Sequence, residues 1–470
     1  MHLHITILAS YSLALMALGL WIGRRVRGAA DFFVASRQLG PGLIFSTLLA
    51  ANIGAGSTVG ATGIGYSNGV SAWWWVGSAA IGSTILAAWI GPAMRREAAA
   101  QSLRTVGDYL EYRYDRTVRG VVSAILWLGS IQLLGAQLIA IGTILDVVAG
   151  VPFAIGCAVG GLVITVYFTA GGLLTSVWVN VVQLGVKLFG FALALPLAVD
   201  AFGGWSAVGR VRPDDASYWT FWRPGPPGLM YLAMLVPAFI VSPGLLQKIF
   251  GARDDRAVRL GVGANAVGLL TYAAVPALLG IIARGRFPQL PDAGLALPMI
   301  LVYGLPPAVG AIGLAAVFSA EVSAADAALF MLTTSLSQDL YKRFANPRAT
   351  DGQVFRVARW TAFLAGAFAT ATAIVSASII GALTIFYTLL GVTLFVPIVA
   401  GLYARRTSSV GALASILAGV CTMLIVQLAT DGRGWGVATP ALVGLAASIA
   451  AWAGSWVVER ARGQFGAQTT

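Results

Sequence analysis

Three ionisable residues lie inside long apolar stretches of the sequence, where charged side chains are rare. They are Lys187, Glu321 and Asp326, and Ser323 lies between the two acids. Ionisable groups at membrane depth usually pair with one another or take part in transport or proton transfer. These residues therefore predict buried ion or proton chemistry.

The residue types that carry most enzymatic and metal chemistry are nearly absent. His2 and His4 are the only histidines, and Cys157 and Cys421 both lie in apolar runs. A nucleophile with a histidine base, or a histidine–cysteine metal site, needs several such residues close together. The sequence also has no Walker A pattern, which argues against an ATP-driven pump. We expect a protein that is not an enzyme and has no bound cofactor.

The composition is that of an integral membrane protein. Of the 470 residues, 58% are hydrophobic and 10% are charged, whereas roughly 25% are charged in an average soluble domain. About 20 apolar residues cross a bilayer, and runs of this length recur along the chain. The net charge of +12 is confined to short gaps between these runs, so it does not indicate nucleic-acid binding.

We expect thirteen transmembrane helices. The apolar runs lie at residues 5–23, 40–66, 70–94, 120–148, 152–170, 174–198, 228–249, 260–283, 306–338, 355–379, 381–403, 408–429 and 435–457. Basic residues follow the first run and none precedes it, which is the reverse of a signal peptide. The run at 5–23 is therefore expected to be a retained helix.

The basic residues predict the orientation in the cell membrane. If the N-terminus lies outside, the outer gaps hold only six of the 30 Lys and Arg residues. These six are Arg210, Arg212, Arg223, Arg284, Arg286 and Arg433. Cytoplasmic segments carry an excess of Lys and Arg, so we expect a multi-pass protein with its N-terminus outside and its C-terminus in the cytoplasm.

Two of the runs contain helix-breaking residues near their middle. The run 40–66 has five glycines between residues 54 and 65, and the run 228–249 has Pro237 and the segment 242–244. Glycine costs about 1 kcal/mol in a helix interior relative to alanine, although membrane glycines also serve close helix packing. Interrupted helices in matching places of two halves indicate an inverted-repeat transporter.

Four parts of the sequence resemble the sodium:solute symporter family. They are residues 31–37 with 50–53 and 63–66, residues 171–183, residues 243–254 and residues 318–341. The resemblance implies an all-α integral membrane protein with a LeuT-like fold, in which the first and sixth core helices are broken. It also implies a secondary active transporter that couples uptake of a small organic solute to sodium by alternating access.

Together these patterns predict one transmembrane transporter domain over residues 1–470. It comprises an extra N-terminal helix at 5–23, five-helix repeats at 40–198 and 228–403, and two C-terminal helices at 408–457. The expected partners are a small-molecule solute, sodium and the lipid bilayer. A proton-coupled or exchange carrier of the same fold, and a non-transporting sensor, remain as alternatives.

The resemblance also implies a sodium site. Carried over by motif, its ligands are the carbonyls of Ala50 and Ile53, the carbonyl of Ala320 and the hydroxyl of Ser323. An unwound helix frees carbonyl oxygens for a cation. Ala320 and Ser323 are three residues apart and so share a helix face.

The sequence departs from the family at two positions near this site. Ala324 stands where a second hydroxyl is usual, and Asn180 stands where an aspartate is usual. Asp326, one turn beyond Ser323, is expected to supply the missing negative charge, or alternatively to make a structural hydrogen bond. Sodium and proton coupling therefore both remain open.

Two interpretations also remain for Lys187 and Glu321. They form an ion pair that neutralises both, or one of them couples transport to protons. Lys187 lies two turns beyond Asn180 on the same helix face. We expect this offset in depth to keep Lys187 away from the ion site.

The solute is expected near the membrane midplane, beside the two breaks. Half-helix N–H groups favour a carboxylate there. Family members that carry sugars have acidic and amide side chains on the first two core helices, and this chain has a tryptophan cluster, which is alternatively an interfacial belt. An amino acid or small carboxylate is therefore favoured over a sugar. The candidate contacts are Asn52, Gly56, Ser57, Trp74, Trp75, Gln132, Phe239, Ser242 and Tyr387.

Overall fold

The protein is described here from a computed structural model. The structure describes residues 2–24, 37–168, 172–213, 215–225, 228–376, 378–404 and 406–461. Residues 31–36 and Gly171, which belong to the family-like segments, lie outside this part of the chain. Across the described residues the chain is helical, apart from loops and two isolated β-bridges. The predicted all-α class is confirmed.

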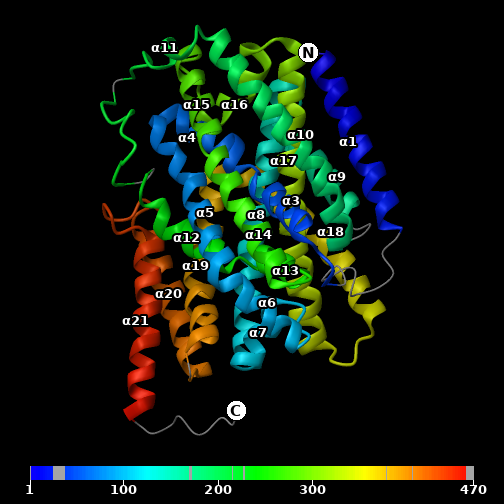
Figure 1. The fold of residues 1–470 in the computed structure, drawn as a ribbon, viewed down its shortest axis with the longest axis vertical. Helices are drawn as coiled ribbons and strands as arrows, with labels where there is room; N and C mark the ends of the chain where they lie inside the picture. The colour runs from blue at the N-terminus through cyan, green and yellow to red at the C-terminus, as the bar shows by residue number, and fades with distance from the viewer. Residues whose placement is uncertain are drawn as a thin grey trace.

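The first half of the chain runs from α1 to α10 (Figure 1). In order, the helices are α1 (His2–Gly23), α3 (Pro41–Asn52), α4 (Ala61–Asn68), α5 (Trp73–Ile85), α6 (Gly91–Ala100), α7 (Val106–Arg113), α8 (Arg116–Ala149), α9 (Phe153–Phe168) and α10 (Gly172–Ala201). Short π-helical turns at Gly56–Gly60 and Leu86–Ile90 lead into α4 and α6.

The second half runs from α11 to α21. Its helices are α11 (Trp205–Val208), α12 (Tyr231–Val241), α13 (Pro243–Phe250), α14 (Asp255–Tyr272), α15 (Ala274–Arg286), α16 (Ala296–Met299), α17 (Pro307–Thr334), α18 (Asp351–Ser376), α19 (Ile379–Tyr403), α20 (Ser409–Ala429) and α21 (Pro440–Ala461). A π-helical segment, Ser335–Ala345, extends α17.

Eleven helices of the described chain are long and apolar enough to cross a membrane, and three apolar helices are shorter. The shorter ones include α3, the first half of a broken helix. The count of thirteen crossings therefore stays a prediction, as do the boundaries of the two repeats.

Both predicted helix breaks are present. α3 ends at Asn52 because Ile53 leaves the helical conformation, with φ −91° and ψ 93°. α12 and α13 are separated at Ser242, whose ψ of 121° is the extended value favoured before a proline. Pro243 then occupies the first turn of α13, where its missing N–H costs nothing.

The two broken helices are enclosed by long helices. α10 packs against α17 and α3, α14 packs against α3, and α8 packs against α17 and α19. α1 lies at one edge of the molecule, and α20 and α21 lie together at the opposite edge (Figure 1). The breaks are therefore positioned by continuous helices rather than by surface loops.

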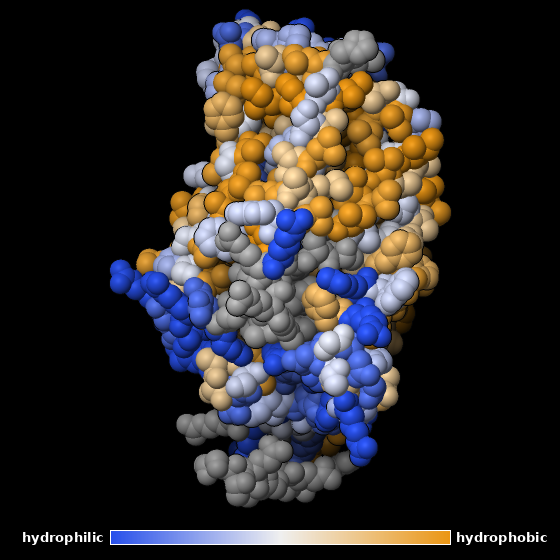
Figure 2. All heavy atoms as spheres, turned by 90° about the vertical axis from the view of Figure 1, so that its right-hand side faces the viewer, coloured by the Kyte–Doolittle hydropathy of each residue, from blue (hydrophilic) through white to orange (hydrophobic). Residues whose placement is uncertain are grey.

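The surface has the character of a protein embedded in lipid. Apolar side chains form a broad band, and hydrophilic side chains gather towards both ends of the long axis (Figure 2). Large apolar side chains are exposed within the membrane-length helices, among them Leu13, Phe189, Val375 and Leu428. Such a surface would drive association in water, and it suits a bilayer.

The ends of the described chain lie at opposite ends of the long axis. α1 begins near the top of Figure 1 and α21 finishes near the bottom. This arrangement agrees with an odd number of crossings. Which end faces the cytoplasm stays a prediction.

A buried ion network joins three elements at the end where α21 finishes. Arg119 on α8 contacts Asp339 at 2.7 Å, Asp108 at 2.8 Å and Glu111 at 3.0 Å. Thr105 caps α7 and also donates a hydrogen bond to Asp339 at 2.6 Å. Arg119 therefore holds α7 against the π-helical extension of α17.

Candidate transport site

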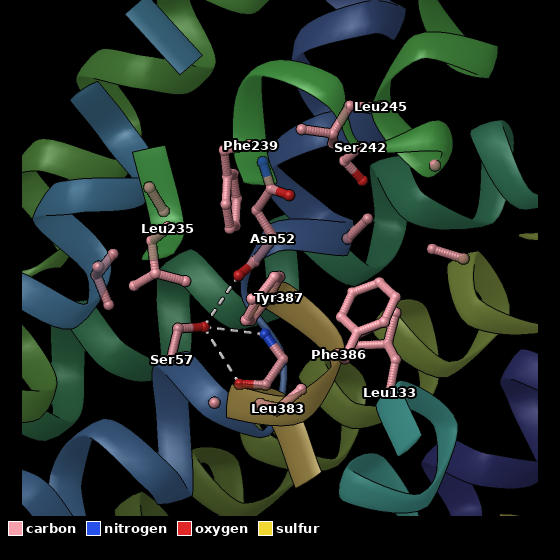
Figure 3. A pocket seen from close by; sticks show the side chains of 18 of the residues that line it. Asn52, Ser57, Leu133, Leu235, Phe239, Ser242, Leu245, Leu383, Phe386 and Tyr387 are labelled. Carbon is pink, nitrogen blue, oxygen red and sulfur yellow. Dashed lines mark hydrogen bonds between the residues drawn. The ribbon is translucent and has the colours of Figure 1, made fainter. Parts of the chain in front are cut away.

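A small cavity of about 60 Å³ lies between the two breaks. It is lined by α3, the π-helical turn after it, α5, α8, α12, α13, α14, α17 and α19. Seven of the nine predicted solute contacts line it: Asn52, Gly56, Ser57, Trp75, Phe239, Ser242 and Tyr387 (Figure 3). The structure therefore brings most of the predicted contacts together in one space.

The other two predicted contacts do not line the cavity. The indole nitrogen of Trp74 donates to the carbonyl of Phe221 at 2.8 Å, and its ring packs against Trp73 and Trp222. The tryptophan cluster is thus divided, since Trp74 holds the long loop after α10 while Trp75 faces the cavity. Gln132 lies on α8 outside the lining.

Gln137, five residues further along α8, lines the cavity and was not predicted. Its Oε1 accepts a hydrogen bond from the N–H of Ala55 at 2.8 Å, and its Nε2 donates to the carbonyl of Leu133 at 3.2 Å. A broken helix leaves backbone N–H groups that need partners. A buried amide on a neighbouring apolar helix is the signal that would have identified it.

The backbone at the first break approaches its neighbours closely. A Cβ atom on Gly54 would lie 2.4 Å from the Cβ of Ala324 and 2.8 Å from Oε1 of Gln137. The freed N–H of Gly54 binds the hydroxyl of Ser57 at 3.0 Å, and that hydroxyl also reaches the carbonyls of Asn52 and Gly54 (Figure 3). Ser57 therefore stabilises the unwound segment.

Aromatic rings form one wall of the cavity. The ring centroid of Tyr387 lies 5.5 Å from that of Phe239 and 6.3 Å from that of Trp75. Trp75 in turn packs edge-on against Tyr231 at 4.9 Å. Three polar groups in the lining make no side-chain hydrogen bond within the described chain: the indole N–H of Trp75, the hydroxyl of Ser242 and the hydroxyl of Tyr387.

The predicted sodium ligands meet one another, and Lys187 meets them. Its ammonium nitrogen lies 2.6 Å from the carbonyl oxygen of Ala50, 3.2 Å from that of Ile53 and 2.5 Å from the hydroxyl of Ser323. The Ser323 hydroxyl also lies 3.0 Å from the carbonyl oxygen of Ala320. All four predicted ligand groups therefore belong to one cluster.

The expectation that Lys187 lies away from the ion site is wrong. α10 packs against both α3 and α17, so it passes beside the break. The four-carbon side chain then places the ammonium several ångströms from its own backbone. The depth of a residue along a helix does not predict where so long a side chain ends.

This geometry does not accommodate a sodium ion on the same ligands. An ammonium group has three N–H donors and no acceptor, and three acceptors surround it here. A sodium ion bound by the same three oxygens would need the position that the nitrogen occupies. The two cations would also repel each other strongly in a buried site.

Glu321 is not in direct contact with Lys187. No salt bridge within 4.0 Å joins the two in the described chain, and Glu321 accepts a hydrogen bond from the hydroxyl of Thr58 at 2.8 Å. The expected ion pair between Lys187 and Glu321 is therefore not formed in the described chain.

Asp326 lies in a second buried polar cluster. It is 2% exposed and lies near Ser176 and Lys248. Lys248 donates to the carbonyl of Thr47 at 2.9 Å, and Asn180 donates to the hydroxyls of Thr47 and Ser176 at 3.0 and 3.3 Å. The carboxyl group of Asp326 therefore lies in the cluster that contains Lys248 and Asn180.

Comparison with known proteins agrees with this architecture. The sequence pattern of the sodium:solute symporter family matches residues 32–419. The sodium/pantothenate symporter of Escherichia coli K12 is 28% identical, with 88% of each chain covered. The sodium/glucose cotransporter of Vibrio parahaemolyticus is 24% identical, and 90% of this chain and 84% of that protein are covered.

Solved structures show the same fold. A sodium-coupled sialic acid symporter in a substrate-bound outward-open state superposes with a TM-score of 0.80, at 18% identity, over 97% of this chain and 98% of that one. Mhp1, a nucleobase-cation-symport-1 transporter, superposes with a TM-score of 0.57 at 15% identity, over 91% of this chain and 94% of that one. The resemblance seen in the sequence is confirmed. The chain belongs to the sodium:solute symporter family, whose members are transporters that use sodium as coupling ion rather than enzymes.

Proposed function

We propose that the protein is a secondary active transporter that moves a small organic solute through the cavity between the two broken helices by alternating access. The solute is an amino acid or a small carboxylate rather than a sugar. In this family the driving gradient is that of sodium.

The observation that carries this proposal is the polarity of the cavity lining. Trp75, Ser242 and Tyr387 present hydrogen-bond donors that have no partner within the described chain. Lys248 adds a positive charge to the lining, and no described lining residue is acidic. Donors and a cation suit a carboxylate, because an ionised carboxylate only accepts hydrogen bonds. Two of the proteins named above carry organic acids, pantothenate and sialic acid.

The test is uptake into proteoliposomes of a radiolabelled panel of amino acids, monocarboxylates and sugars. Each is measured with a sodium gradient, a proton gradient or neither. We expect accumulation of an acidic or zwitterionic solute. Accumulation of a sugar, with none of the acids transported, would contradict the proposal.

Two variants connect uptake to the cavity. Tyr387→Phe and Trp75→Phe each remove one unpaired donor, and each should raise the KM of the transported solute about tenfold, as loss of a hydrogen bond to a charged group does. Trp89 and Tyr403 are exposed at 65% and 55%, so Trp89→Phe and Tyr403→Phe are matched controls. Equal KM values in all four variants would place the solute elsewhere.

A second candidate function is a proton-coupled or exchange carrier of the same fold. One observation favours it, namely that the ammonium of Lys187 binds the predicted sodium ligands. Counterflow distinguishes the two candidates. An exchanger loaded with unlabelled solute takes up labelled solute without any ion gradient, at a rate that sodium does not change.

A further inference from the structure

We propose that Lys187 is the resident cation of the site formed by Ala50, Ile53 and Ser323, so that this chain binds no sodium ion there. The side-chain ammonium of Lys187 occupies the position that the family resemblance assigns to a sodium ion. The inference concerns the ion and not the solute. It holds or fails independently of the proposed function.

The carbonyl groups of Ala50 and Ile53 lack the hydrogen-bond partners that a continuous helix would give them. In a continuous helix, the carbonyls of residues 50 and 53 would accept the N–H groups of residues 54 and 57. Here the N–H of Gly54 binds the Ser57 side chain, and the N–H of Ser57 binds the carbonyl of Gly54 at 3.0 Å. The break therefore leaves the carbonyls of Ala50 and Ile53 without their helical partners, in a site where both residues are 0% exposed.

The second step is that Lys187 satisfies these groups completely. Its three N–H donors meet three oxygens, at 2.6, 3.2 and 2.5 Å. The hydroxyl hydrogen of Ser323 is directed to Ala50 or Ala320, whose oxygens lie at 2.8 and 3.0 Å. Lys187 and Ser323 are both 0% exposed. All three donors of the ammonium are therefore used, and the ammonium nitrogen occupies the space between the oxygens of Ala50, Ile53 and Ser323.

The third step is the charge around the site. Glu321, next to Ala320 on α17, is buried but forms no salt bridge with Lys187 in the described chain. Lys248 on α13, which donates to the carbonyl of Thr47 on α3, is a further buried cation. Asn180, on the face of α10 that also carries Lys187, is neutral. A sodium ion added here would stand beside the buried Lys187 ammonium, which has no carboxylate within 4.0 Å in the described chain, and this is unfavourable in a site of low polarity.

The fourth step explains one departure from the family. The position that usually holds a second hydroxyl is Ala324, whose methyl group packs against the backbone of Gly54. An ammonium uses only three acceptors, so a further hydroxyl has no role at this site. Ala324 and Lys187 are thus both consistent with a lysine ammonium in place of a sodium ion at this site.

Direct binding of the ion tests the inference. The probe is radioactive ²²Na⁺, bound to the purified full-length protein at constant ionic strength with choline chloride as replacement salt. We expect the wild type to show no saturable sodium binding that Ser323→Ala changes. Lys187→Ala leaves the freed carbonyls in place, so it should gain one saturable site per molecule. Adding Ser323→Ala to that variant should weaken the new site at least tenfold.

Lys248→Ala is the matched control, because it also removes a buried lysine next to α3 but does not empty the ligand set. The Lys248→Ala variant should gain no saturable sodium site whose affinity falls when Ser323→Ala is added. Saturable sodium binding by the wild type that Ser323→Ala reduces would overturn the inference. A Lys187→Ala variant that elutes as folded protein but gains no site would overturn it as well. If Lys187→Ala does not fold, the wild type and Ser323→Ala still decide the question.

Discussion

The side-chain amide of Gln137 stabilises the backbone at the first helix break, beside the cavity. Gln137 is 1% exposed and accepts the hydrogen bond of the Ala55 N–H. We predict that Gln137→Ala lowers the unfolding free energy by about 1–3 kcal/mol, because a buried donor is left without a partner. Thermal unfolding in detergent measures this. Gln132→Ala, on the same helix, is the control and should change stability much less.

Gly54 is the second residue on which the break depends. The Cβ of an alanine at this position would lie 2.4 Å from the Cβ of Ala324, and Cβ atoms in proteins essentially never approach another heavy atom this closely. We predict that Gly54→Ala strongly reduces the yield of folded protein, since the Cβ of Ala324 is attached directly to the α17 backbone and Gln137 is buried. Gly42→Ala on α3, with nothing within 4 Å, should give a normal yield. Equal yields on size-exclusion chromatography would contradict this reading.

Some residues of the candidate site could be predicted from the sequence and others could not. Glycines and the family motif correctly brought Ala50, Ile53, Ala320 and Ser323 together, because these residues are fixed by the helix break and by helical spacing. The position of Lys187 was missed, since a long flexible side chain ends far from its own backbone. Gln137 was missed because one amide in an apolar helix has no periodic pattern.

At the scale of elements, the Arg119 network determines how α7 is held. Removing one partner of a buried ion cluster leaves the others uncompensated, at a cost of about 3–5 kcal/mol. We therefore predict that Arg119→Leu lowers the unfolding free energy by several kcal/mol. Arg96, whose side chain is 57% exposed in its pair with Asp255, is the control, and Arg96→Leu should cost at most about 1 kcal/mol. Denaturant unfolding of both variants checks the difference.

The helix breaks could be predicted from composition, because glycine and proline act locally on the backbone. The π-helical turns at Gly56–Gly60 and Ser335–Ala345 could not. Such turns depend on what packs against the helix rather than on the preferences of its own residues. The sequence accordingly predicted a break within the run 40–66 but not the path of the chain into α4.

At the scale of the whole molecule, the orientation in the membrane is directly testable. Ala216 lies in the loop between α11 and α12, and Gly352 lies in the first turn of α18; both are exposed. On a background without Cys157 and Cys421, we predict that Ala216→Cys is labelled in intact cells by a membrane-impermeant maleimide and that Gly352→Cys is labelled only after lysis. The reverse pattern would place the N-terminus in the cytoplasm.

Hydropathy predicted the membrane class and where most helices run, since twenty apolar residues in a row have few other solutions. It did not predict that α10 packs along both α3 and α17. Such neighbour relations arise from side-chain complementarity between segments far apart in the sequence.

The covalent attachment of the Lys187 ammonium has a consequence for electrical behaviour. An ion that is bound on one side and released on the other crosses the membrane field, and at 100 mV each elementary charge gains or loses about 2.3 kcal/mol. A tethered charge returns to its starting point in every cycle, so this site contributes no net current. If Lys187 is the cation of this site, the membrane voltage does no net work through the site in a transport cycle. A zwitterionic solute that crosses without any other ion would then distribute across the membrane independently of the voltage.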